Sequence, residues 1–227
     1  MFNYLSEKGI VLDIKTAENL KNFENLLVEW NKKFNLTSIT SSEDIEIKHF
    51  EDCLMGEKLF PLNKKVVEVG SGGGFPSIPL MIKRGDLEFT LIESTGKKCE
   101  FLTKVVDNLN LKAKIFNKRA EDVGRSEYRE SFDIVTARAV ASLNTLAEYC
   151  LPLIKVGGLF IAYKSANLEE LKTAENALKI LGGEVVETFN YSLSKDLGER
   201  VIYVIKKVEK TPSIYPRGNG KERSKPL

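Results

Sequence analysis

A glycine-rich turn follows an apolar stretch in the segment EVGSGGGFP, which begins at Glu68. Four of the five residues from Gly70 to Gly74 are glycine, and glycine lets a ligand approach the backbone closely. A phosphate-binding loop needs Lys and then Ser or Thr after its last glycine, but Phe75 and Pro76 stand there. A dinucleotide-binding turn needs glycine at its sixth position, which is Phe75. The turn therefore predicts a ligand other than a nucleotide phosphate or a dinucleotide, one that binds exposed backbone amides beside a carboxylate.

The pattern that remains is an acidic residue followed by alternate glycines: Glu68, Gly70, Gly72 and Gly74. It resembles motif I of the class I S-adenosylmethionine-dependent methyltransferases, which implies that these residues contact the cofactor. S-adenosylmethionine carries a carboxylate and an ammonium, which suit exposed amides and a nearby acid. Glu93, at the end of the next expected strand, would accept hydrogen bonds from the ribose hydroxyls. Dehydrogenases have an acid at the same position, so Glu93 does not distinguish between the two cofactors. The missing sixth glycine does, and it disfavours a nicotinamide oxidoreductase.

Hydrophobic periodicity divides the chain into three parts. Residues 1–62 are expected to form a helical cap with an apolar stripe: Leu20, Phe23, Leu26, Leu27, Trp30 and Phe34. Ser41 and Asp44 have the spacing of a capping box before a second helix. Residues 63–208 alternate strands with helices, which predicts a doubly wound α/β sheet. The resemblance to motif I implies that this sheet is the Rossmann-like core of a class I methyltransferase. Two final strands at 182–193 and 199–208 are separated by a short polar loop, which predicts a hairpin with an antiparallel last strand and hence an antiparallel edge strand.

Composition and cysteine content indicate the class of protein and its cellular compartment. The chain has 227 residues, 42% hydrophobic and 29% charged, with no apolar run near the roughly 18 residues that span a bilayer. Three widely spaced cysteines predict free thiols in a reducing cytoplasm, without a disulfide or metal site. His49 is the only histidine, and we expect it to link the cap to the core by hydrogen bonds. We expect a monomer.

The C-terminal extension, residues 209–227, is basic and rich in proline and glycine. Arg217, Lys221, Arg223 and Lys225 fit contacts to RNA phosphates, although a solvated terminus would have the same charge. We expect this segment to be extended and to fold only on RNA, with Tyr215 available to stack on a base. The sequence thus favours a polyanionic partner.

The methyl acceptor is narrowed by motifs that the chain lacks. Adenine amine methylation usually relies on an Asn- or Asp-Pro-Pro-aromatic motif after the fourth strand, where this chain has TARAVAS. Pyrimidine C5 methylation needs a cysteine nucleophile in a Pro-Cys context, and Cys150 precedes Leu151 and Pro152 instead. Guanine N7 has a free lone pair and needs positioning rather than a general base. It is therefore the favoured acceptor, with another RNA base or a protein as alternatives.

A wider resemblance covers the chain from about Asn35 to Leu227. The segments EVGSGGGFPSIPL, RAEDV, ARAVAS, GGLFIAYK and TPSIYPRGNGKERSKPL together resemble the bacterial small-subunit rRNA guanine-N7 methyltransferases, historically called glucose-inhibited division protein B. The resemblance implies methylation of guanine N7 in the 530 loop of 16S rRNA, on free RNA or on the small subunit. This chain has Gly73 where the family often has proline. A non-catalytic rRNA-binding factor with a relic pocket is the remaining alternative.

The same resemblance assigns roles to individual residues. Gly70 and Phe75 would contact the cofactor, and Ala120 and Glu121 would border the adenine. Arg138 would lie at the mouth of the site beside the methionine end or the incoming guanine, unless it pairs with Glu121 or Asp122. Two further cations, Lys164 and Arg200, are expected to contact RNA. Lys97 and Lys98 are expected on a solvated helix face.

Overall fold

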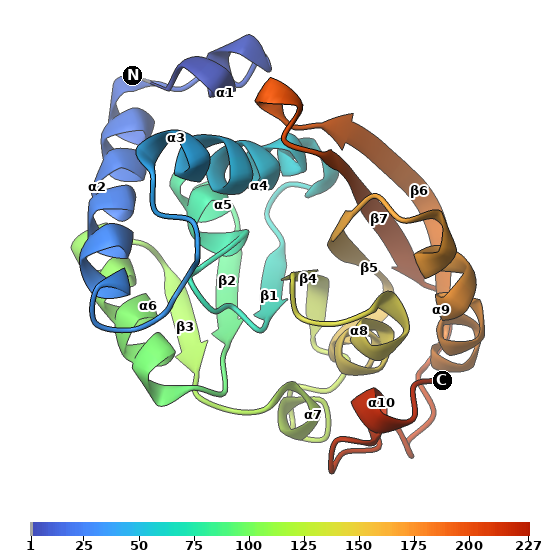
Figure 1. Ribbon diagram of the computed structural model, residues 1–227. Helices are drawn as coiled ribbons and strands as arrows, with labels where there is room; N and C mark the ends of the chain where they lie inside the picture. The colour runs from blue at the N-terminus through green and yellow to red at the C-terminus, as the bar shows by residue number, and fades with distance from the viewer. Residues whose placement is uncertain (1) are drawn as a thin grey trace.

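The computed structural model describes residues 2–227, apart from the side chain of Leu168, and places one sheet between two layers of helices (Figure 1). The strand order is β3-β2-β1-β4-β5-β7-β6. The strands are β1 (Lys65–Val69), β2 (Glu88–Ile92), β3 (Ala113–Phe116), β4 (Phe132–Arg138), β5 (Ile154–Ser165), β6 (Gly183–Ser192) and β7 (Glu199–Lys207). The first five are parallel to one another, and β7 runs antiparallel to β5 and β6.

This topology confirms the predicted doubly wound α/β sheet with an antiparallel last strand. The antiparallel edge strand of the hairpin is β6, because β7 is inserted between β5 and β6. Its burial explains the position: Ile202 and Ile205 are fully buried, whereas β6 exposes most of its residues. A strand that is apolar on both faces needs cover, and the more polar β6 tolerates the edge.

Helices cover both faces of the sheet (Figure 1). One layer holds α2 (Ile14–Asn31), α3 (Ser42–Ile45), α4 (Asp52–Met55), α5 (Ser77–Lys83) and α6 (Gly96–Asn108), with the short α1 (Asn3–Glu7) beside it. The other layer holds α7 (Ala120–Val123), α8 (Leu143–Cys150), α9 (Leu168–Leu181) and α10 (Lys221–Ser224). Within β1, Val66 joins the core that contains Phe23 of α2, and Val67 joins the core that contains Leu146 of α8. The apolar strands therefore bury both faces.

The N-terminal segment packs its apolar stripe on the first layer. Asp13 caps α2 by accepting a hydrogen bond from the Thr16 amide at 2.7 Å, and α2 ends at Asn31, before Phe34. The Ser41 hydroxyl caps α3 by accepting from the Asp44 amide at 3.1 Å, as the spacing predicts. The second expected helix is continuous from residue 42 to 55, but a π-helical turn, Glu46–Glu51, interrupts its α-helical pattern. Such turns are frequent at functional sites.

The C-terminal extension is folded onto the second layer, so the expectation of an extended segment is wrong. Arg129 donates hydrogen bonds to the backbone oxygens of Tyr215 at 2.7 Å and Thr211 at 2.8 Å. The fully buried ammonium of Lys207 donates to the Thr211 hydroxyl at 2.5 Å. Burial lowers the pKa of Lys207 to about 8, and the carboxylate of Glu130 offsets part of that effect. These contacts hold the start of the extension against the core.

Candidate active site

The glycine turn is fixed to the end of β2 by backbone hydrogen bonds. The amides of Gly70 and Ser71 donate to the Ile92 carbonyl at 2.9 and 3.1 Å. Gly70 and Gly72 have positive φ angles of 73° and 52°, which L-residues with a side chain rarely adopt. A Cβ on Gly72 would meet no atom closer than 3.8 Å, so its missing side chain leaves open space. The turn therefore exposes its backbone, as the sequence predicts.

Glu93 joins this turn to the next strand end. Its Oε2 accepts from the Gly72 amide at 2.9 Å, and its Oε1 accepts from the Thr95 amide at 2.8 Å. The carboxylate therefore lies at the carboxyl ends of β1 and β2, where ligands bind in open α/β sheets. It holds the turn and also faces the cavity described next.

A cavity of about 560 Å³ lies over these strand ends. Its lining includes seven residues predicted from the sequence: Gly70, Gly72, Phe75, Glu93, Ala120, Glu121 and Arg138. The volume lies within the range of roughly 300–1,000 Å³ that is typical of small-molecule sites. Bare amides, an acid at the second strand end and the first residues of α7 suit the amino acid, the ribose and the adenine of S-adenosylmethionine, respectively. The residues present therefore fit this cofactor.

Two predicted cofactor residues lie outside the cavity lining. A Cβ on Gly74 would meet Ile78 at 2.5 Å, so this glycine permits close packing of α5. Glu68 is fully buried beneath the turn, and neither carboxylate oxygen has a hydrogen-bonding partner among the described residues. The strand alternation that places Val67 and Val69 on one face turns Glu68 toward the other. Both residues therefore have structural roles, Gly74 in the packing of α5 and Glu68 in the core next to the turn.

The buried Glu68 predicts a pH-dependent stability. Burial raises the pKa of Glu68 to about 7, and the nearby Ser71 and Ser77 offset only part of the rise. Between pH 4.5 and 7 the folded chain keeps a proton that the unfolded chain releases, so the free energy of unfolding falls as pH rises. Glu68→Gln is expected to remove this dependence and to be more stable than the native chain at pH 8 by about 3 kcal/mol. Urea unfolding at pH 5 and 8 measures the difference; equal pH dependence in both proteins would contradict it.

Several cavity residues were not predicted from the sequence. Thr37 and Ile39 reach the cavity from the loop before α3, Lys98 from α6 and Tyr149 from α8. The Lys98 side chain was expected on a solvated face. Arg223, expected to contact RNA, also lines this cavity because α10 folds against α8. Only residues 35–40, NLTSIT, have a recognisable pattern in the sequence, a polar break between two amphipathic helices, and this pattern does not indicate a ligand.

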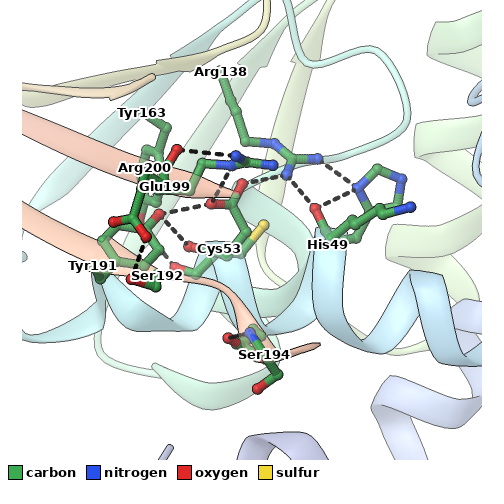
Figure 2. Close-up of polar contacts among 12 residues, drawn as sticks. His49, Cys53, Arg138, Tyr163, Tyr191, Ser192, Ser194, Glu199 and Arg200 are labelled. Carbon is green, nitrogen blue, oxygen red and sulfur yellow. Dashed lines mark hydrogen bonds and ion pairs between the residues drawn. The ribbon is translucent and has the colours of Figure 1, made fainter. Parts of the chain in front are cut away.

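Arg138 is the centre of a polar network between the cap and the core (Figure 2). Its Nη1 donates to Asp52 Oδ2 at 2.6 Å and to the Lys48 carbonyl at 3.0 Å. Its Nη2 donates to His49 Nδ1 at 2.8 Å, and its guanidinium lies 5.1 Å from the centre of the Phe75 ring. The alternative pairing with Glu121 or Asp122 is wrong; the carboxylate partner is Asp52.

The contact with Arg138 fixes the protonation of His49. A guanidinium can only donate, so the 2.8 Å contact makes Nδ1 an acceptor, and the Lys48 carbonyl 3.2 Å from Nδ1 accepts from Arg138 instead. The ring proton then lies on Nε2, 3.0 Å from the Thr37 hydroxyl. Burial and the positive charge of Arg138 lower the pKa of His49 to about 3. The ring also stacks on Phe75, with centroids 4.1 Å apart. The predicted hydrogen-bonded link between cap and core is therefore confirmed, with a neutral imidazole.

A second cavity, of about 400 Å³, adjoins the first. The two cavities share four lining residues: Ile39, His49, Arg138 and Ala139. Lys164 and Arg200, both predicted to contact RNA, line the second cavity. The Lys164 ammonium pairs with Glu170 Oε1 at 2.5 Å and donates to the Ala141 carbonyl at 2.7 Å, which favours an internal role. The Nε of Arg200 lies 3.7 Å from Asp52 Oδ1.

Arg217, the first of the predicted tail cations, is also engaged internally. Its Nε and Nη2 donate to the two oxygens of Glu148 at 2.9 and 2.6 Å, and Glu148 is fully buried. Glu222 of α10 is likewise buried and accepts a hydrogen bond from the Gly218 amide. Lys221, Arg223 and Lys225 remain exposed on the surface of the folded extension.

We expect Arg217→Ala to release the extension. The substitution leaves the buried Glu148 carboxylate without its cation, which is expected to cost about 2 kcal/mol given the partial exposure of Arg217. Limited proteolysis should then cut within residues 209–227 faster than in the native chain. Lys225→Ala, an exposed change in the same segment, is the control. Equal cleavage rates in all three proteins would show that this ion pair does not hold the extension.

Comparison with known proteins places the chain in a family. Residues 16–198 match the family described as GidB, rRNA small subunit methyltransferase G. The chain is 44% identical to ribosomal RNA small subunit methyltransferase G of Staphylococcus aureus, over 98% of this chain and 95% of the relative. The chain belongs to this family. It is a methyltransferase of small-subunit rRNA, and S-adenosylmethionine is its methyl donor.

Solved structures show the same fold at low identity. M. jannaschii TYW2, crystallised with AdoMet, superposes with a TM-score of 0.57 at 14% identity, over 75% of this chain and 80% of that one. P. horikoshii TYW2, crystallised with MeSAdo, gives 0.55 at 16% identity, over 69% and 61%. Both share the class I methyltransferase fold with this member of the GidB family. In the part of the chain that the structure describes, no helix could cross a membrane and no group of acidic, histidine or cysteine side chains could hold a metal ion.

Proposed function

We propose that this GidB-family chain transfers a methyl group from S-adenosylmethionine to N7 of a guanosine in the 530 loop of 16S rRNA. One observation supports N7 as the acceptor atom: among the described side chains where the two cavities meet, none is suited to remove a proton from the base. His49 is neutral, its Nδ1 accepts from Arg138, and its pKa is about 3. N7 carries no proton at neutral pH, so the transfer needs position and desolvation alone.

The cysteines support the same choice. Burial raises the pKa of the Cys53 thiol well above its ordinary value, and Cys150 behaves in the same way. A thiolate nucleophile, as pyrimidine C5 methylation requires, would need a low thiol pKa and access to the base. Neither thiol lines the two cavities. The chemistry of the site therefore favours an acceptor that is already nucleophilic.

The chain's own residues would bind and orient the cofactor. Glu93 would accept hydrogen bonds from the ribose hydroxyls. The amides from Gly70 to Gly72 would face the amino-acid end, and the start of α7 would border the adenine. Bound S-adenosylmethionine supplies an electrophilic methyl group on a sulfonium. Phe75, which contacts both His49 and Arg138, gives this part of the wall a fixed shape and excludes water.

Three exposed cations of the extension supply the proposed electrostatic contact to RNA: Lys221, Arg223 and Lys225. Three further cations, Lys164, Arg200 and Arg217, would add positive charge near the RNA while they keep their ion pairs within the protein. Exposed lysines that contact phosphates make binding depend on salt. The double substitution Lys221→Gln and Lys225→Gln is expected to reduce the slope of log affinity against log salt by about two. Lys104→Gln on α6 is the control, and filter binding to 16S rRNA at several salt concentrations is the measurement. An unchanged slope would exclude these lysines as phosphate contacts.

The acceptor is tested by mapping the methylated nucleoside. Small subunits from cells that lack the gene are incubated with the purified protein and S-adenosylmethionine, and digested 16S rRNA is analysed by mass spectrometry. We expect 7-methylguanosine in the fragment that contains the 530 loop, with free 16S rRNA compared in parallel. Methylation of another base or atom would contradict the proposal.

We further propose that the protein acts as a monomer in the cytoplasm, where ribosomal subunits are found. Sedimentation of the purified chain tests the oligomeric state.

A further inference from the structure

The second cavity has the position and chemistry of a site for the acceptor base. It adjoins the cofactor cavity, and the two meet at Ile39, His49, Arg138 and Ala139. A base whose reacting atom faces this junction would have the rest of its ring in the second cavity. The cavity of about 400 Å³ is large enough for a single nucleobase, because small-molecule sites begin at roughly 300 Å³.

Arg138 presents a donor at the junction. Its contacts to Asp52, Lys48 and His49 use fewer N–H groups than a guanidinium carries. In guanine, the O6 acceptor lies beside N7 on the same edge of the ring; in adenine, an amine donor occupies that place. A guanidinium therefore attracts the guanine edge and disfavours the adenine edge, which would bring two donors together.

Glu170 presents an acceptor on the wall of the second cavity, near the start of α9. Its Oε1 accepts from the Leu143 amide at 2.9 Å and pairs with Lys164 at 2.5 Å. Its Oε2 has no hydrogen-bonding partner among the described residues, and the side chain is only 13% exposed. The carboxylate is thus held in place by two contacts through one oxygen and can accept through the other. Guanine carries N1–H and a 2-amino group on its Watson–Crick edge, on the side of O6 away from N7, and both are donors.

We propose that the second cavity binds the acceptor guanine with O6 toward Arg138 and with its N1–H and 2-amino edge toward the Glu170 carboxylate. This inference rests on the proposed N7 methylation. The two side chains contact adjoining edges of one base, so adenine would fail at both: its amine faces Arg138, and it lacks the donors for Glu170. Glu170 is then a specificity-determining residue, and Asp52 is the positioning residue that holds Arg138.

Replacing the target guanosine by inosine tests the contact to Glu170. Inosine keeps N7, O6 and N1–H but lacks the 2-amino group, so it removes one donor from the proposed contact. Small subunits are reconstituted with spliced 16S rRNA that carries either nucleoside at the target, and kcat/KM for methyl transfer is measured. The native protein is expected to prefer guanosine by roughly 10-fold, as loss of a hydrogen bond to a charged group predicts.

Glu170→Gln is expected to lose most of this preference and roughly 10-fold of its activity on guanosine, because the free carboxylate oxygen is replaced by an amide. The preference is a ratio within one protein, so it does not depend on the fraction of the variant that folds. Glu169→Gln changes the exposed neighbouring carboxylate and should keep the native preference. Calorimetry should give unchanged S-adenosylmethionine affinity for both variants.

A native preference for guanosine that survives in Glu170→Gln would overturn the inference, as would a native protein that does not distinguish the two nucleosides. Neither result would affect the proposed function, because the native protein would still produce N7-methylated purine at the target. Failure of the native protein to methylate N7 at all would instead contradict the proposed function.

Discussion

Gly72→Leu is expected to abolish measurable binding of S-adenosylmethionine while leaving the fold intact. A side chain at this position would project into the cavity, since a Cβ built on Gly72 meets nothing within 3.8 Å. It would occupy the space beside the amides and beside Glu93, which accepts from the Gly72 amide. A steric block at the centre of a site costs at least roughly 100-fold in affinity, about 2.7 kcal/mol. Isothermal titration of the purified variant measures the loss.

Gly9→Leu separates this steric effect from backbone strain. Gly9 has a φ of 74°, and a Cβ there would meet nothing within 4 Å. Both substitutions place leucine in the left-handed region, which costs about 1–2 kcal/mol of stability. Both variants should therefore unfold more easily, but only Gly72→Leu should lose the cofactor. Native affinity in Gly72→Leu would show that the methyl donor binds elsewhere, and the proposed site would be wrong.

The sequence predicts the sheet and the glycine turn because their signals are local. Apolar strands with few polar positions, such as Val66 and Val67 in β1, predict a sheet that is covered on both faces. The positive φ angles of Gly70 and Gly72 can be predicted because glycine is the only residue type that adopts them freely. The position of β7 is not a local property: a hairpin spacing specifies antiparallel pairing with β6 but not which of the two strands pairs with β5.

Side-chain partners in the site are the part that the sequence does not predict. Arg138 and Asp52 lie 86 positions apart and meet only because the cap covers the carboxyl ends of the strands. Glu148 and Arg217 are separated by 69 positions and pair because the extension folds back over α8. Charge composition predicts contacts of Arg217 with RNA but not its pair with Glu148. Burial of an acid such as Glu148 would indicate such a pair, but burial within an amphipathic helix is known only once its neighbours are placed.

The pair between Arg138 and Asp52 gives the second large expected effect. Asp52→Asn keeps the size of the side chain but leaves the nearly buried guanidinium without its carboxylate, since both side chains are less than one-seventh exposed. Removing one partner of a buried ion pair typically costs about 3 kcal/mol or more. The free energy of unfolding from urea titration should fall by about that amount, whereas Glu29→Gln, which removes an exposed pair with Lys33, should change it by less than about 0.5 kcal/mol.

The activity of Asp52→Asn should fall further than its stability, because one guanidinium positions several groups. Arg138 also donates to His49, and both side chains contact Phe75 on the cavity wall. Without the Asp52 carboxylate the guanidinium loses its charged partner in the cap, and the junction of the two cavities loses its fixed shape. Misplacing reacting groups by about 1 Å can cost roughly 100-fold in rate. We therefore expect kcat to fall by about that factor at a temperature where the variant is folded; native kcat would show that the junction does not depend on this pair.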